Sequence, residues 1–423
     1  MSTASISQHD FAEKYFKLNF FLGVTNGILF NFAWAFTSGS TILPLFISKL
    51  TSSSILVGLA STLEGVGWAL PQMAVAAVTL HQKKQMPLYI KMAFLRGVAF
   101  SLLATLVFFS KTVNPSYLLI TFFFLFSIYA FGGGVSGVSF MEVVGKTVPP
   151  NKRGSFFGMR MFFGGGLAAL AGILIERILR VYDFPKNFGV LFLIAAVIII
   201  LALLSFSLVR EPPVEQRPQR RKFSENLRLG FEILKKDRNL RMLLWTRVAI
   251  GSYVLGLPFY IIFAKNVLFI PTYIAGLFLS VQMVGYLSSN ILWGRLSNKK
   301  SNCLVLLLSA ICSAIPPFLL LLNIFIKMPI YIYSAIFFFL GATMSGMDMG
   351  YTNHLLEIAP EEKRPIYVGF LNTIVGPTIF LSALGGLIIQ VSSFAFLYSL
   401  VFLVSIGSIF LSLSLGTQRP LNS

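Results

Sequence analysis

Charged side chains are scarce in this sequence, and their scarcity excludes a large class of proteins. Asp, Glu, Lys and Arg make up 12% of the 423 residues, whereas soluble domains carry about 25%. Hydrophobic residues make up 56%, and the mean hydropathy is +0.79. These values exclude a soluble globular protein. Because about twenty apolar residues cross a bilayer as a helix, the composition predicts an all-α polytopic membrane protein.

Acidic residues are scarcer than basic ones. The chain has 15 Asp and Glu against 34 Lys and Arg, a formal net charge of +19. In a soluble protein this excess would suggest nucleic-acid binding, but too little soluble sequence remains for such a domain. We therefore predict no nucleic-acid partner. The charge is interpreted as an orientation signal, since basic residues collect in cytoplasmic loops.

Cysteine and histidine are also few, which argues against disulfides, metal centres and catalysis. Cys303 and Cys312 share one apolar stretch without zinc-ligand spacing. His9, His81 and His354 are scattered, and no catalytic motif surrounds them. His354 and Glu357 have the spacing of a metal-ligand pair, but a solvated helix end accounts for them. The sequence has no P-loop, so direct ATP drive is not expected. From the cysteine and histidine pattern we predict no cofactor, no metal and no enzyme activity.

Apolar runs separated by polar residues predict about twelve membrane spans. The predicted spans lie near 18–46, 55–80, 88–110, 117–141, 155–176, 188–208, 242–263, 273–293, 304–326, 330–350, 367–391 and 395–415. A polar interruption falls inside the first span. The expected organisation is a cytoplasmic segment 1–17, a six-helix bundle 18–208, a cytoplasmic basic linker 209–241, a second six-helix bundle 242–415 and a cytoplasmic tail 416–423.

The distribution of loop charges predicts the orientation. With the N-terminus inside, the loops after the even-numbered spans carry most of the basic residues, such as Lys83, Lys84, Lys299 and Lys300. The opposite loops carry only Lys49, Lys111, Arg177, Arg180, Lys186, Lys265 and Lys327. We therefore expect a protein of the cell membrane (plasma or inner membrane) with both termini in the cytoplasm.

The two halves of the chain repeat each other. Val148-Pro149-Pro150-Asn151-Lys152-Arg153-Gly154 matches Ala359-Pro360-Glu361-Glu362-Lys363-Arg364-Pro365, and Val57-Gly58-Leu59 matches Ala275-Gly276-Leu277. Both offsets are close to half the chain length. Parallel repeats with a substrate cavity between them are a transporter architecture, so the sequence predicts two pseudo-symmetric six-helix bundles.

With these features the chain resembles the major facilitator superfamily over essentially its whole length. Leu80-His81-Gln82-Lys83-Lys84 keeps the basic end of the family's Gly-x-x-x-Asp-Arg-x-Gly-Arg-Arg loop but lacks its Asp and glycines, and Gly294-Arg295-Leu296-Ser297-Asn298-Lys299-Lys300 is closer to it. The resemblance implies the family's fold and secondary transport by alternating access. It also implies that spans one, two, four and five, with their counterparts in the second half, line the substrate path.

Charged residues inside spans are functional candidates, because each costs a few kcal/mol in a bilayer. Glu64, near the middle of the second span, is the candidate for proton coupling. The alternative is a structural carboxylate, hydrogen-bonded or paired with Arg96. Arg160 and Arg247 either bind an anionic substrate or pair with carboxylates at an inner gate. The gate is favoured, and its candidates are Glu142, Arg160, Arg247, Arg295 and Asp348.

Uncharged polar residues in the spans extend the candidate substrate path, although buried amides also join helices as packing contacts. The complete set of substrate-path candidates is Asn26, Asn31, Glu64, Gln72, Arg96, Tyr253, Tyr260, Gln282, Asn290 and Asn372. Two glycine pairs, Gly133 with Gly137 and Gly346 with Gly350, predict close helix packing rather than binding.

The linker has its own pattern. Phe223, Leu227, Phe231 and Leu234 recur at about one helical turn among basic residues, which is typical of an amphipathic helix on an anionic inner leaflet.

The sequence thus predicts a monomeric secondary active transporter of a small molecule, coupled to protons, with anionic lipid at its cytoplasmic face. Drug or metabolite efflux by antiport is the alternative within transport. An integral-membrane transferase and a transporter-derived sensor are the alternatives from other classes.

Overall fold

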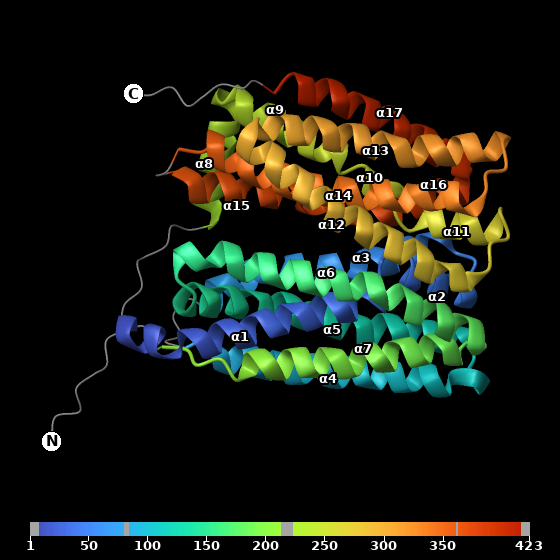
Figure 1. Ribbon diagram of the computed structural model, residues 1–423, viewed down its shortest axis with the longest axis horizontal. Helices are drawn as coiled ribbons and strands as arrows, with labels where there is room; N and C mark the ends of the chain where they lie inside the picture. The colour runs from blue at the N-terminus through green and yellow to red at the C-terminus, as the bar shows by residue number, and fades with distance from the viewer. Residues whose placement is uncertain (1–7, 80–83, 213–222, 361–362, 416–423) are drawn as a thin grey trace. The chain divides into compact units, whose positions relative to one another are not determined.

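The computed structural model describes residues 8–79, 84–212, 223–360 and 363–415, and every regular element within them is a helix (Figure 1). In these residues, 12 helical stretches are long and apolar enough to cross a membrane. The predicted all-α polytopic membrane architecture is therefore confirmed. The expected tail 416–423, the start of the cytoplasmic segment, and parts of the basic loops and linker (80–83 and 213–222) lie outside the described residues.

The first half of the chain forms α1 (Gln8–Ala35), α2 (Ile42–Leu50), α3 (Ser54–Thr79), α4 (Met86–Phe109), η1 (Ser110–Thr112), α5 (Pro115–Thr147), α6 (Pro150–Val181) and α7 (Lys186–Ser207). The second half forms α8 (Phe223–Lys236), α9 (Arg238–Ile250), α10 (Tyr253–Gly256), α11 (Phe259–Asn266), η2 (Thr272–Ile274), α12 (Ala275–Lys299), α13 (Asn302–Phe325), α14 (Ile330–Ile358), α15 (Arg364–Val375), η4 (Gly376–Phe380), α16 (Leu381–Val391) and α17 (Phe394–Leu413).

Contacts divide the described residues into two compact units. Unit 1 takes those within Met1–Thr51, Leu63–Pro218 and Thr272–Gly276, and unit 2 takes those within Ser52–Thr62, Gln219–Pro271 and Leu277–Ser423. Within unit 1, α1 packs on α6 and α7, and α4 packs on α5 and α7. Within unit 2, α13 packs on α14 and α17. The sequence-derived bundle limits stay predictions.

The first predicted span is divided between two helices. α1 ends at Ala35, and α2 begins at Ile42. In the polar interruption between them, the hydroxyl groups of Ser38 and Ser40 are hydrogen-bonded at 2.9 Å. Serine side chains compete with the helical pattern for hydrogen bonds, so the polar interruption ends one helix and starts another.

Two later spans are also broken. The seventh consists of α9, α10 and α11, with Gly251 directly after α9 and Pro258 directly before α11. The eleventh consists of α15 and α16 joined by η4, which contains Gly376 and Pro377. Proline lacks the amide that continues a helix and its ring clashes with the preceding turn, which accounts for the break before α11 and for the 3-10 segment η4 in the eleventh span.

The amphipathic helix predicted in the linker is present as α8, and it packs on α15 within unit 2. Gly230 lies against the ring of Phe370, and Phe231 meets the same ring at a centroid distance of 5.0 Å. After α8, Asp237 accepts a hydrogen bond of 2.8 Å from the Tyr367 hydroxyl group. The helix therefore has a protein neighbour for part of its apolar face, and its contact with anionic lipid stays a prediction.

One buried carboxylate joins the region after α7 to two other helices of unit 1. Glu211 has a side chain only 1% exposed. It accepts hydrogen bonds from the amides of Gln85 and Met86 at the start of α4, both at 2.8 Å, and lies 2.5 Å from Lys146 Nζ of α5. Free amides at a helix N-terminus favour an anion, so one side chain caps α4 and neutralises a buried lysine.

The substitution Glu211→Gln tests this contact. It removes a buried charge that both Lys146 and the start of α4 require, so we expect the free energy of unfolding to fall by about 2–4 kcal/mol. Thermal unfolding of the purified protein measures it. The control is Glu232→Gln, which removes an exposed pair with Arg228 and should change stability little. Equal effects of the two substitutions would contradict the structural role of Glu211.

Candidate functional site

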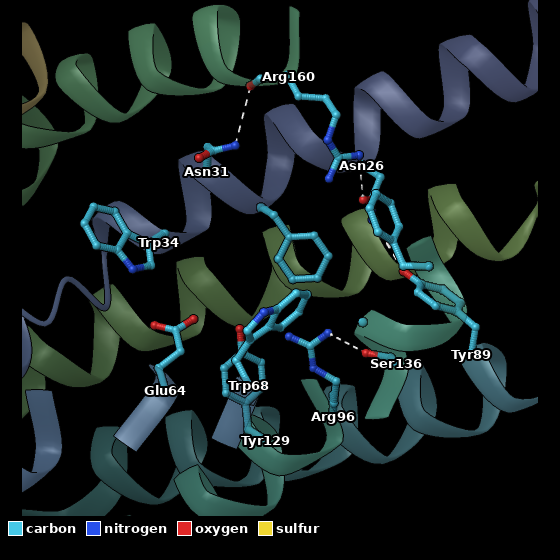
Figure 2. A pocket seen from close by; sticks show the side chains of 13 residues that line it. Asn26, Asn31, Trp34, Glu64, Trp68, Tyr89, Arg96, Tyr129, Ser136 and Arg160 are labelled. Atoms are coloured by element: carbon cyan, nitrogen blue, oxygen red, sulfur yellow. Dashed lines mark hydrogen bonds between the residues drawn. The ribbon is translucent and has the colours of Figure 1, made fainter. Parts of the chain in front are cut away.

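Side chains of unit 1 line a cavity of about 260 Å³ (Figure 2). Its size lies near the lower limit of small-molecule sites, which begin at about 300 Å³. Five helices, α1, α3, α4, α5 and α6, contribute to it. The lining residues are Asn26, Phe30, Asn31, Trp34, Glu64, Trp68, Tyr89, Arg96, Tyr129, Ser136, Gly137, Phe140 and Arg160.

Arg96 is a nearly buried cation on α4, with 7% of its surface exposed. Its guanidinium carbon lies 5.1 Å from the ring centroid of Phe30 and 4.8 Å from that of Tyr129. Nη1 donates to Ser136 Oγ at 3.2 Å, and Nε has no hydrogen-bond partner among the described residues. The aromatic rings stabilise the positive charge, but they accept no hydrogen bond from the Nε–H group.

Glu64 contributes the only carboxylate among the lining residues. It is half-buried on α3, and the indole of Trp34 lies next to its carboxyl group (Figure 2). The positive charge of Arg96 attracts the carboxylate, and the indole N–H of Trp34 donates a hydrogen bond to it. Among the described ion pairs within 4.0 Å, none joins Glu64 to Arg96. The direct pairing that the sequence left open is therefore absent from this structure.

Arg160 of α6 is the second cation of the cavity. Its Nη1 donates to the carbonyl oxygen of Gly23 and, at 3.2 Å, to Asn26 Oδ1. Its guanidinium carbon lies 4.7 Å from the ring centroid of Phe140 and 5.3 Å from that of Phe156. All of these partners are neutral. Arg160 is thus held in place without a carboxylate that cancels its charge.

The two asparagines predicted on the first span both line the cavity, and both are held by backbone groups. Asn26 is 1% exposed and donates to the Ala202 carbonyl oxygen at 2.8 Å. Asn31 donates to the Gly27 carbonyl oxygen at 2.8 Å. Asn26 also accepts from Arg160, so it fixes the position of a charged group as well as joining two helices.

Several lining residues were not among the sequence-derived candidates. They are the aromatic residues Phe30, Trp34, Trp68, Tyr89, Tyr129 and Phe140, together with Ser136 and Gly137. A signal was present for some of them: Asn26, Phe30 and Trp34 are spaced four residues apart, and so are Glu64 and Trp68. Such residues share one helix face. Gly137 was expected to serve packing alone, but it borders the cavity, where it leaves room for the Trp68 ring.

Close approach of two helix backbones sets the distance across part of the site. A Cβ atom on Gly134 of α5 would overlap the Gly67 carbonyl oxygen of α3. Glycine at this position therefore lets α3 and α5 touch. Since Trp68 directly follows Gly67, the same contact positions one wall of the cavity.

The remaining substrate-path candidates do not line this cavity. Gln72 is half-buried on α3. In unit 2, Tyr253, Tyr260 and Gln282 are buried, Asn290 is half-buried and Asn372 is exposed. Tyr260 packs in the helix core, where its backbone oxygen accepts a hydrogen bond of 2.7 Å from the Tyr333 hydroxyl group. The place of these candidates in a substrate path stays a prediction.

The gate candidates fall into both units. In unit 2, Arg247 Nη1 lies 3.9 Å from Asp348 Oδ1, and its guanidinium carbon lies 4.8 Å from the ring centroid of Tyr351. In unit 1, Glu142 is half-buried on α5. Arg295 is exposed on α12. The Arg247–Asp348 contact is one of the pairs suggested by the sequence, and its action as a gate stays a prediction.

His354 belongs to a polar cluster in unit 2. Its Nδ1 lies 3.1 Å from Glu357 Oε2, and Cys303 Sγ lies 3.7 Å from the same nitrogen. Asn302 Nδ2 donates to Glu357 Oε1 at 2.6 Å. Among the described residues, no group of three or more His, Cys, Asp or Glu has an arrangement that could hold a metal ion.

Comparisons place this architecture among known proteins. A sequence profile of the Major Facilitator Superfamily matches residues 270–422. This match covers the second half of the chain, whose sequence is therefore similar to that superfamily. No curated protein matches this chain significantly in sequence.

Solved structures of the same fold cover nearly the whole chain. The xylose transporter XylE from E. coli, in a partially occluded inward-open conformation, has a TM-score of 0.69 and 15% identity, covering 96% of this chain and 100% of its own. The nucleoside transporter NupG has a TM-score of 0.70 and 12% identity, covering 94% and 99%. A POT family transporter in complex with 5-aminolevulinic acid has a TM-score of 0.69 and 12% identity, covering 96% and 97%. At such identities the likeness shows the fold alone.

The α3–α5 contact is testable with a pair of glycine substitutions on α5. Gly134→Ala forces α3 and α5 apart, so we expect the free energy of unfolding to fall by about 1–3 kcal/mol, the usual cost of overpacking. Gly145→Ala is the control, because a Cβ atom there meets nothing within 4 Å and alanine favours the helix. Thermal unfolding of both variants measures the difference. A Gly134→Ala protein as stable as Gly145→Ala would refute the proposed close contact.

Proposed function

We propose that this protein is a secondary active transporter of the major facilitator type that moves a small molecule by alternating access and uses a proton gradient. The cavity of unit 1 forms part of the substrate path. The observation that carries the proposal is the charge of the cavity lining: one carboxylate and two guanidinium groups line this cavity inside an apolar helix bundle. Charges there are costly, and a purely structural role would favour pairing them directly.

Proton coupling is assigned to Glu64. It is the only carboxylate among the lining residues, it is half-buried, and it has no direct ion pair among the described residues. A carboxyl group that exchanges a proton during transport needs this combination of access and incomplete neutralisation. A D-xylose-proton symporter, whose solved structure has a similar fold, supports coupling of this kind.

The substitution Glu64→Gln tests the proposed function. We expect it to abolish uptake driven by a pH gradient while substrate exchange at equal pH continues, because the amide preserves the shape but cannot take up a proton. A thermal-shift panel of metabolites first identifies a ligand, and proteoliposomes loaded with its radiolabelled form then measure both fluxes.

The matched control is Glu176→Gln. Glu176 is an acidic residue of α6 that pairs with Arg180 outside the cavity. It should leave both fluxes unchanged. Undiminished driven uptake by Glu64→Gln would overturn the coupling assignment. Saturable binding without any flux would favour a sensor, outward flux would favour efflux by antiport, and chemical turnover of the ligand would favour a transferase.

Orientation is a separate part of the proposal. We place both termini in the cytoplasm of a cell whose plasma or inner membrane holds the protein, because basic residues collect in the loops on that side.

Cysteine labelling at two lysine positions tests this orientation. Lys111 lies in η1, and Lys299 ends α12. In a background with Cys303→Ala and Cys312→Ala, Lys111→Cys should react with a membrane-impermeant maleimide on intact cells, and Lys299→Cys should react only after permeabilisation. The reverse labelling pattern would contradict this orientation.

A further inference from the structure

The cavity of unit 1 carries more positive than negative charge. Arg96 and Arg160 are cations at every physiological pH, and Glu64 supplies at most one negative charge. Among the described ion pairs within 4.0 Å, neither arginine meets a carboxylate. A surplus of at least one positive charge therefore remains in an apolar surrounding, whatever the protonation state of Glu64.

Arg96 is the group best placed to use this surplus. It is more than nine-tenths buried, and its Nε lacks a partner among the described residues although its Nη1 binds Ser136. An unsatisfied buried donor costs about 1–3 kcal/mol. The ring centroids of Phe30 and Tyr129 lie 5.1 and 4.8 Å from the guanidinium carbon. The N–H groups along the planar edge of the guanidinium group therefore remain as its hydrogen-bond donors. A planar acceptor with two oxygens matches that edge.

The rest of the lining is aromatic. The indoles of Trp34 and Trp68 both line the cavity (Figure 2), and Trp68 is 47% exposed. An exposed indole in an otherwise packed bundle is a surface for an apolar or aromatic group. Arg160, held by the neutral Gly23 and Asn26 oxygens, adds positive potential without occupying this surface.

We propose that the cavity binds a small organic anion whose carboxylate is received by Arg96 and whose aromatic or apolar body lies against Trp34 and Trp68. This inference rests on the proposed function, because it names the substrate class of the same site. The bound anion supplies the negative charge that the lining lacks and the acceptor that Arg96 Nε lacks. A neutral ligand supplies no charge, and a cation adds to the surplus.

Calorimetric titration of the full-length protein in nanodiscs at neutral pH tests the ligand class. The probes are benzoate, phenylacetate and indole-3-acetate, each compared with its own amide, together with benzylamine and phenylalanine. At least one carboxylate should bind about tenfold or more tightly than its amide. Tighter binding of the amides, the amine or the zwitterion would overturn the proposal. No carboxylate binding up to about 10 mM would also overturn it.

Two substitutions in the cavity should move the affinity of a carboxylate in opposite directions. Arg96→Gln should weaken it about tenfold or more, because the paired donors are lost. Glu64→Gln should strengthen it several-fold, because a nearby negative charge is removed. Arg180→Gln is the control, since this arginine of α6 is exposed and lies outside the lining. Weaker carboxylate binding by Glu64→Gln would contradict an anion site even if Arg96→Gln failed to fold.

Flux separates this inference from the proposed function. Proteoliposomes with a radiolabelled form of the best-binding carboxylate should accumulate it. If the protein binds a carboxylate through Arg96 but shows no flux of it, the proposed transport is overturned and the anion site is retained. Accumulation of a neutral or cationic compound with no carboxylate binding would retain transport and overturn the anion class.

Discussion

Exclusion of water from the bilayer core is the constraint on which this structure depends. Every backbone amide and carbonyl group in the spans must find its partner inside the protein, and a helix supplies those partners within one segment. The same constraint acts on side chains, because a charged group that faces lipid has nothing to solvate it. Polar residues of the spans are therefore drawn inward, where they join helices or border a cavity.

Two buried charges show the different outcomes of that constraint. Glu211 is satisfied completely, by two helix-terminal amides and Lys146. Arg96 is satisfied only in part, by two aromatic rings and one hydroxyl group, and its Nε remains without a partner among the described residues. A fully paired charge contributes to stability. An incompletely paired charge at a cavity wall retains the capacity to bind, so the pairing of a charge separates the structural group from the functional candidate.

The sequence allowed part of the candidate site to be predicted, because intramembrane charges and amides are rare enough to single out. Asn26, Asn31, Glu64, Arg96 and Arg160 were named for that reason, and the structure brings these five together. The aromatic lining could not be singled out in the same way. The chain contains 43 Phe and 14 Tyr, so the identity of a single ring carries little information, and only its position on a helix face distinguishes a lining residue from one that faces lipid.

The amino-acid sequence by itself determined the all-α polytopic class and the approximate course of the spans, because insertion into a bilayer depends on local hydropathy along the chain. The tertiary structure decided which charges share a cavity, that Glu64 and Arg96 do not pair directly, and where α3 and α5 touch. Those features depend on the rotation of each helix and on the close approach at Gly67 and Gly134. Helices that are apolar on nearly all sides do not reveal their rotation through hydrophobic periodicity, so only the packed structure establishes it.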